Sequence, residues 1–478
     1  MIYDIAIIGT GVTGAAIART LSAYELNIAL IDKECDVSFG TSKANSGIIH
    51  AGFHSPKKYL KSRLEIQGNL MFDKLKEELG FPFKRVGVLV VAFTEEELRI
   101  IETLYNQGVE NGSLGIEICG RDRTLELEPK LNKDVIGSLY APIGGIVEPY
   151  RFVFSLVESA VKNGVELILN FEVVKGYFKG DYYEIISKDE RVIKAKYIIN
   201  ASGVYADEIS KIFNAEEFKI IPRKGEEYLL DKNSPGFPSK VIFPVPSKVS
   251  KGILVIPTVE GTMMVGPTAI EVESKEDKST SSENLELIFQ FAKRLIPSIT
   301  EKDIITSFAG LRPALETGDF YIDISKKAKN FIQVAGIQSP GLTAAPAIAL
   351  YVKDLLKMNG LKLVEKKDFD PYLEKVPRVR NLSYNEIDEL VTKNPNYGNI
   401  ICRCEMVSEE EIVEAIKRGH TTLDGIKFFT RAGMGRCQGG FCTYRILKII
   451  MRETGLPFDK ITKRGGKSYI IKGGKLSL

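Results

Sequence analysis

Four of the six cysteines in this chain lie close together near its C-terminal end. They are Cys402, Cys404, Cys437 and Cys442, whereas Cys35 and Cys119 stand alone. In a reducing compartment such a cluster indicates metal binding rather than disulfide bonds. The spacing therefore predicts a metal centre in the last fifth of the chain.

A second group of residues with possible chemistry opens the chain. Gly9, Gly11 and Gly14 follow an apolar run, and a second apolar run ends at Asp32. In a strand–turn–helix–strand unit, such glycines let a pyrophosphate approach the backbone at a helix N-terminus, and the acid accepts a hydrogen bond from a ribose hydroxyl. The pattern predicts dinucleotide binding, and an ordinary turn between strand and helix is the alternative. It does not distinguish a nicotinamide from a flavin.

A polar, glycine-rich stretch over residues 40–54 comes next and contains two of the three histidines. Loops of this composition beside a nucleotide-binding strand tend to line the cofactor. A solvated connection is the alternative.

Composition narrows the function further. A formal charge of +3, from 65 basic and 62 acidic side chains, gives no reason to expect a nucleic-acid or membrane surface as the main partner. No apolar run approaches the ~20 residues that a membrane-spanning helix needs. The first strand leads directly into the glycine turn, so it does not read as a signal peptide. We expect a cytoplasmic protein.

The elements that must position these residues form an α/β pattern. A strand over residues 195–200 leads into a second small-residue turn at 200–203, and a third strand–helix junction spans residues 331–358. Short apolar runs between turn residues in 225–268 predict an inserted β-rich unit. The nucleotide-binding domain is therefore expected to be discontinuous.

Together these glycine-rich stretches resemble the flavoprotein family of glycerol-3-phosphate dehydrogenases and oxidases, L-2-hydroxyglutarate dehydrogenases and related amino-acid oxidases. The matching stretches are 9–14, 41–52, 147–151, 200–203, 222–225, 308–313 and 335–346. The resemblance covers about residues 1–360 and implies FAD as the cofactor.

The resemblance also implies a role for each matched position. Gly9, Gly11 and Gly14 would hold the pyrophosphate and Asp32 the adenosine ribose. The flavin would be flanked by Thr41, Ser42, Asn45 and Ser46. The adenine would meet the backbone of Val173, and the pyrophosphate would be closed over by Ala201 and Gly203. The last junction, with Gly336, Gly341, Leu342 and Thr343, would point N–H groups at the flavin, where negative charge develops on reduction.

The C-terminal part, from residue 399, resembles the small [2Fe–2S] domain of the bacterioferritin-associated ferredoxin type. Four thiolates are what a two-iron cluster requires, so Cys402, Cys404, Cys437 and Cys442 would be its ligands. A zinc site with four cysteines is the alternative, although Cys402 and Cys404 are spaced more tightly than zinc pairs usually are.

The resemblance implies a fold and domain boundaries. We expect an α/β plus α+β protein with a discontinuous Rossmann-like FAD domain over residues 1–80, 145–220 and 305–360. An antiparallel β-rich substrate domain would take 81–144 and 221–304, a linker 361–395, and a small helical [2Fe–2S] domain with a tail 396–478.

Oxidation of a hydroxyl group needs a nearby base, and an anionic substrate needs a cation to bind it. His50 and His54 follow the flavin loop, and histidine titrates near neutral pH. His50 is a candidate base or a structural hydrogen-bonding residue of its loop, and His54 is a candidate for substrate binding. Arg312 suits an anionic group, since a guanidinium binds phosphate or carboxylate through two hydrogen bonds. Further cations are Arg223, Lys224 and Lys251.

The expected activity is oxidation of glycerol 3-phosphate, with electrons leaving through the cluster to a flavoprotein subunit of a hetero-oligomer. An L-2-hydroxy acid or amino-acid dehydrogenase is the first alternative. An electron-transfer subunit without a substrate of its own, and an oxidase that uses O2, are the others. The sequence does not separate a phosphate from a carboxylate on the substrate.

Overall fold

The computed structural model describes residues 1–232, 234–246 and 252–471. Within these ranges the chain forms two compact units, one of residues 1–33 and 38–373, the other of residues 34–37 and 374–471. No helix in the described ranges is both long enough and apolar enough to cross a membrane.

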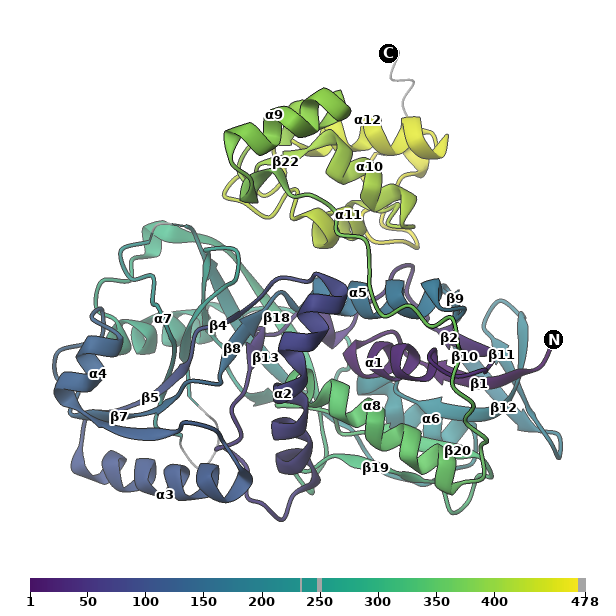
Figure 1. Cartoon of the computed structure of the whole chain (residues 1–478), viewed down its shortest axis with the longest axis horizontal. Coiled ribbons are helices and arrows are strands. Elements are labelled where there is room, and N and C mark those ends of the chain that lie inside the picture. The colour runs from purple at the N-terminus through teal and green to yellow at the C-terminus, as the bar shows by residue number, and fades with distance from the viewer. Residues whose placement is uncertain (233, 247–251, 472–478) are drawn as a thin grey trace. The chain divides into compact units, whose positions relative to one another are not determined.

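The first unit contains a sheet of eight strands built on the glycine turn (Figure 1). Its central strands β12, β1, β2 and β9 run parallel, as does β20 beside β12, whereas β10, β11 and β19 are antiparallel. The bounds are β1 Tyr3–Ile8, β2 Ile28–Ile31, β9 Glu166–Ile168, β10 Val173–Phe178, β11 Tyr183–Ser187, β12 Val192–Asn200, β19 Tyr321–Ile324 and β20 Phe331–Ala335. Strands far apart in sequence therefore make one nucleotide-type sheet.

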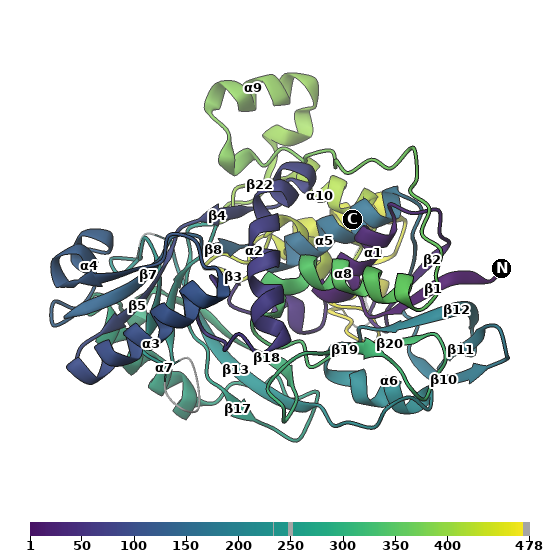
Figure 2. The same cartoon turned by 60° about the horizontal axis from the view of Figure 1, so that its bottom comes forward.

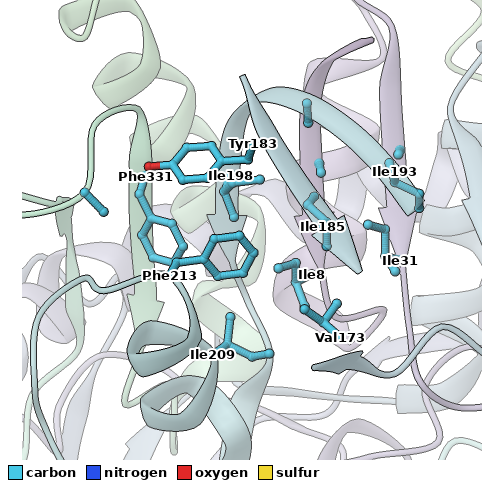
Figure 3. Packing of buried hydrophobic residues seen from close by; sticks show 14 of the residues in the cluster. Ile8, Ile31, Val173, Tyr183, Ile185, Ile193, Ile198, Ile209, Phe213 and Phe331 are labelled. Atoms are coloured by element: carbon cyan, nitrogen blue, oxygen red, sulfur yellow. The ribbon is translucent and has the colours of Figure 1, made fainter. Parts of the chain in front are cut away.

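Both faces of this sheet are covered, because successive side chains of its strands point to opposite sides and both sets are buried. Ile8, Ile31 and Ile198 belong to a cluster with Ile209 of α6 and Phe213, which directly follows that helix (Figure 3). Among the other helices of this unit, α8 packs against α1 and α2, and α1 packs against α5 (Figure 2). These helices are α1 Val12–Leu21, α2 Leu60–Leu79, α5 Pro149–Lys162, α6 Ala206–Ile212 and α8 Gly341–Met358.

A second sheet of nine strands, mostly antiparallel, lies in the same unit. It combines two separate parts of the chain, because β14 pairs with β5. Its strands are β5 Val88–Ala92, β6 Glu117–Gly120, β7 Gly137–Ala141, β13 Ile221–Leu230, β14 Val241–Pro244, β15 Leu254–Pro257, β16 Met263–Gly266, β17 Ile270–Glu271 and β18 Ile304–Ala314. The helices α3 Glu95–Asn111, α4 Arg121–Leu127 and α7 Ser282–Leu295 accompany it, and β3 Ile48–Ile49, β4 Phe83–Arg85 and β8 Gly145–Val147 form a small third sheet.

The strand β18 departs from the expected arrangement. Residues 305–360 were expected to belong to the nucleotide-binding domain, yet β18 pairs with β13 along the whole length of both strands. Backbone hydrogen bonding thus places Arg312 on the second sheet, beside Arg223.

The second unit is small and largely helical, as expected. It contains α9 Tyr384–Lys393, β21 Ile400–Cys402, β22 Val407–Ser408, α10 Glu409–Lys417, α11 Leu423–Thr430 and α12 Thr443–Thr454. Capping boxes begin both α9, at Ser383, and α10, at Ser408. The helix α9 falls inside the stretch 361–395 that was expected to be a linker.

Candidate functional site

The two glycine turns of the first unit meet at the carboxyl ends of β1 and β12. Gly9 has φ +113°, and a Cβ there would lie 2.4 Å from the carbonyl oxygen of Ala201. A Cβ on Gly14 would lie 1.9 Å from the Gly9 carbonyl oxygen. Gly203 also has a positive φ, +61°. Only glycine permits this close approach, and the cradle fits a dinucleotide pyrophosphate at the start of α1.

Asp32 directly follows β2 and lies next to this turn. One carboxylate oxygen accepts hydrogen bonds from the Thr10 backbone N–H, at 2.7 Å, and from the Thr10 hydroxyl, at 2.5 Å. The acid is therefore fixed against the glycine turn. Its contact with a ribose remains a prediction.

The loop over residues 41–47 connects this cradle to the second sheet. The Ser42 hydroxyl accepts a hydrogen bond from the Val12 N–H in the first turn of α1, at 2.9 Å. The Thr41 hydroxyl donates to the Leu311 carbonyl of β18, at 2.6 Å. Asn45 holds the loop closed, since its amide donates to the Ser42 carbonyl and accepts from the Gly47 N–H. Contact of these residues with the flavin stays a prediction.

His50 lies against the beginning of α8. Its backbone N–H donates to the Thr343 hydroxyl at 2.9 Å, and its Nε2 lies 3.1 Å from the Ser339 hydroxyl oxygen. α8 begins at Gly341, and the first N–H groups of a helix have no acceptor within the helix. Gly341, half-buried Leu342 and buried Thr343 therefore present the helix terminus that was expected to face the flavin.

The cofactor roles of Gly336 and Val173 remain predictions, and the structure shows only the position of each residue. Gly336 follows β20 with φ +69°, and a Cβ there would lie 2.5 Å from the Leu315 side chain. Val173 begins β10 and its side chain is buried in the cluster of Figure 3.

The two histidines share an aromatic surrounding. The His54 ring lies 4.2 Å from the Phe53 ring and 5.0 Å from the Phe243 ring, centroid to centroid. His50 and His54 meet edge to face at 5.8 Å. The structure thus brings both candidates together beside Phe243 of the second sheet.

Arg312 is the cation best placed near the loop. It donates from Nη2 to the Thr268 carbonyl. Burial lowers the pKa of Arg312 to about 10, although the Glu227 carboxylate opposes that shift. The guanidinium therefore keeps its charge at neutral pH. Arg223 and Lys224 already pair with acids, Glu271 and Asp277, and Lys251 lies outside the described residues.

The sequence analysis missed Glu227. This side chain of β13 is 3% exposed, and it accepts a hydrogen bond from the Ser46 hydroxyl at 2.9 Å. Burial raises the pKa of Glu227 to about 7, although Ser46 and Arg312 oppose the shift. Two consecutive glutamates directly before the apolar end of this strand, Tyr228–Leu230, were the available signal.

The cysteine site of the second unit contains two close pairs of thiols. The sulfur atoms of Cys404 and Cys437 lie 3.5 Å apart. The hydrogen bond from the Cys442 thiol, with backbone N–H groups of Gly433 and Glu405, lowers the pKa of Cys402 to about 6. N–H groups of Phe441 and Gly439 likewise donate to Cys437.

Backbone N–H groups that donate to sulfur stabilise thiolates, the form in which cysteine binds iron. The four thiols and their N–H donors therefore fit an iron–sulfur cluster. In the part of the chain that the structure describes, no three or more His, Cys, Asp or Glu side chains are arranged to hold a single metal ion. A two-iron cluster takes two cysteine ligands at each iron, and the two thiol pairs provide that number.

Comparison with known proteins finds one family match in each unit. A family model described as FAD dependent oxidoreductase matches residues 4–355, and one described as BFD-like [2Fe-2S] binding domain matches residues 400–452. The chain belongs to the FAD-dependent oxidoreductase family and carries a [2Fe–2S] domain. Its cofactors are FAD and a [2Fe–2S] cluster.

Individual relatives point to a narrower group. The chain is 46% identical to a glycerol 3-phosphate dehydrogenase of Caloramator mitchellensis over 98% of both chains. It is 33% identical to a glycerol 3-phosphate oxidase of Mycoplasma genitalium, over 77% of this chain and 97% of that one. The structure of the L-alpha-glycerophosphate oxidase from Mycoplasma pneumoniae with FAD bound superposes with a TM-score of 0.75 at 30% identity, covering 79% of this chain and all of that one.

Proposed function

We propose that this protein is a glycerol-3-phosphate dehydrogenase that oxidises the C2 alcohol of its substrate to a ketone, giving dihydroxyacetone phosphate. Its electrons then leave through the [2Fe–2S] domain to a partner flavoprotein subunit. The choice of substrate rests on the 46% identity to the Caloramator dehydrogenase. That similarity extends over 98% of both chains and so includes the cysteine site.

Three side chains receive roles in this proposal. Arg312 binds the phosphate, because its guanidinium is charged and can form paired hydrogen bonds. His50 accepts the proton of the C2 hydroxyl at a ring nitrogen, and its backbone bond to Thr343 fixes it beside the start of α8. His54, packed on Phe53 and Phe243, borders the substrate.

When bound, FAD would accept the hydride from C2 and the cluster would transfer single electrons. Residues 9–14, 41–46, 201–203 and 341–343 would hold FAD. The four cysteines of the cysteine site would hold the cluster. We place the protein in the cytoplasm, because reduced thiols are needed to ligate iron. We also propose that it is one subunit of a hetero-oligomer that contains the partner flavoprotein.

An anaerobic substrate panel tests the proposal. FAD-loaded protein is mixed with glycerol 3-phosphate, L-2-hydroxyglutarate, L-lactate and amino acids, and flavin absorbance is followed. We expect rapid bleaching by glycerol 3-phosphate alone. Bleaching by L-2-hydroxyglutarate with no response to glycerol 3-phosphate would overturn the substrate, and bleaching by none of them would favour an electron-transfer subunit.

A further inference from the structure

Glu227 is a buried carboxylate whose hydrogen bonding is incomplete. Its Oε1 accepts from Ser46, but its Oε2 has no hydrogen-bond partner among the described residues, although the atom is buried. The preceding residue provides a contrast. Glu226 is equally buried, and its carboxylate accepts from the Ser281 N–H at 2.8 Å and from the Asn284 amide at 2.7 Å. A buried acceptor left unpaired is costly, so Glu227 is placed for something other than stability.

Strand register puts Glu227 and Arg312 on the same face of the second sheet. Directly paired residues of antiparallel strands point to the same side, as do alternate residues of one strand. The pairs Glu227 with Phe308, Gly225 with Gly310 and Arg223 with Arg312 therefore all share a face. Glu227 and Arg312 belong to the two end pairs of this array, and the Arg312 side chain extends over Gly225 in its middle.

Those glycines allow the loop over residues 41–47 to approach the same face. A Cβ on Gly310 would lie 2.0 Å from the Ala44 carbonyl oxygen, and one on Gly225 would lie 2.8 Å from Arg312 Nη2. Ser46, two residues beyond Ala44, donates to Glu227. The face with Glu227 and Arg312 is thus the one that meets the loop expected to line the flavin.

We propose that Glu227 determines substrate specificity at C1: it accepts a hydrogen bond from the C1 hydroxyl of glycerol 3-phosphate and repels a carboxylate at that carbon. This inference rests on the proposed function, in which Arg312 binds the phosphate. An L-2-hydroxy acid carries a carboxylate next to the alcohol carbon that is oxidised. That carboxylate would meet the Glu227 carboxylate with poor screening, and like charges brought together in a buried site are unfavourable.

Two substrate analogues isolate the two halves of this inference. The first is 3-phosphoglycerate of matching configuration at C2, which differs from glycerol 3-phosphate only by a C1 carboxylate. The second is propane-1,2-diol 1-phosphate, which lacks only the C1 hydroxyl. The test measures the inhibition constant of the former and kcat/KM of the latter, at a pH above 8 so that Glu227 is ionised.

The variant Glu227→Gln removes the charge but keeps the size of the side chain. We expect the inhibition constant of 3-phosphoglycerate to fall by about tenfold or more, since a buried like-charge contact is relieved. In Glu227→Leu, the preference for glycerol 3-phosphate over propane-1,2-diol 1-phosphate should also shrink by about tenfold, because no acceptor remains for the C1 hydroxyl. Flavin absorbance and a melting curve show whether each variant is folded and loaded.

Glu226→Gln is the matched control, because the same chemical change is made one residue away on the opposite face. In this variant the inhibition constant of 3-phosphoglycerate and the preference for glycerol 3-phosphate over propane-1,2-diol 1-phosphate should keep their wild-type values, even if the protein is less stable. Unchanged selectivities in Glu227→Gln and Glu227→Leu, with glycerol 3-phosphate still reducing the wild-type flavin, would overturn only the role of Glu227. If wild-type flavin is reduced by hydroxy acids and not by glycerol 3-phosphate, the proposed function fails first and the repulsion at C1 fails with it.

Discussion

At the scale of single residues, burial determines how Glu227 titrates. The pKa of this carboxyl is raised to about 7 in the folded protein, from 4.5. The folded state thus holds the proton more tightly than the unfolded chain, and raising the pH between these values favours unfolding. Once Glu227 is ionised in both the folded and the unfolded state, its raised pKa lowers the free energy of unfolding by about 3 kcal/mol.

Glu227→Gln should remove this loss. We expect the free energy of unfolding of the variant to exceed that of the wild type by more at about pH 8 than at about pH 5. Urea unfolding of both proteins at the two pH values, with FAD present, measures the difference. A constant difference across the range would show that Glu227 does not titrate there.

Arg312→Lys should separate charge from geometry. Lysine keeps the positive charge but loses the planar fork that binds a phosphate through two hydrogen bonds. We expect KM for glycerol 3-phosphate to rise about tenfold or more, with a smaller change in kcat. Steady-state kinetics provide the measurement. Arg223→Lys, whose parent arginine already pairs with Glu271, should change KM far less. Equal effects of the two variants would argue against a special role for Arg312.

His50→Asn should distinguish a base from a structural residue. The bond to Thr343 uses the backbone N–H of His50 and survives the substitution. If the ring accepts the substrate proton, the rate of flavin reduction falls about 10²-fold or more, and its dependence on pH changes, leaving only the contribution of Glu227 near pH 7. Stopped-flow absorbance across a pH series measures both. A reduction below tenfold with an unchanged pH profile would assign His50 a structural role.

The sequence predicted several of these residues by type but could not predict their partners. His50 and Thr343 were both expected near the flavin, yet their hydrogen bond joins residues 293 positions apart. Glu227 was missed because its significance depends on pairing between β13 and β18, which decides that it shares a face with Arg312 while Glu226 turns away. Local sequence does not contain that register.

At the scale of elements, the β1–α1–β2 unit was predictable because its glycine spacing and strand lengths are local signals. The placement of β18 was not, since a strand that follows a long insertion can join either sheet. Pairing with β13 decided it. Helix α12 was also unforeseen, although its N-cap residue, Cys442, is one of the predicted ligands.

The glycine turn makes a sharp prediction for Gly14→Ala. The added Cβ would lie 1.9 Å from the Gly9 carbonyl oxygen, so the turn and α1 must move apart. We expect the dissociation constant for FAD to rise at least tenfold, because the pyrophosphate depends on this cradle. Fluorescence titration of the apoprotein measures it. Gly120→Ala is the control, since a Cβ there meets no atom within 4 Å and the residue lies in β6 of the second sheet. Unchanged affinity in Gly14→Ala would place the pyrophosphate elsewhere.

At the scale of the whole molecule, the chain combines two units with different redox chemistry. Substrate oxidation delivers two electrons at once, whereas an iron–sulfur cluster transfers them singly. A protein with both cofactors can therefore accept a hydride and still serve a one-electron partner. The proposed route makes the two functions separable by mutation, because the residues that bind substrate and the cysteines lie in different units.

Cys404→Ser tests this separation directly. Serine is a poor ligand for iron, so the cluster should be lost or altered, while the residues around His50 and Arg312 are untouched. We expect anaerobic flavin reduction by glycerol 3-phosphate at the wild-type rate. Turnover with a one-electron acceptor such as ferricyanide should fall at least tenfold. Cys119→Ser, which changes a buried cysteine of β6, should retain both activities. If Cys404→Ser also retains full turnover, electrons leave from the flavin itself, and the cysteine site serves another purpose.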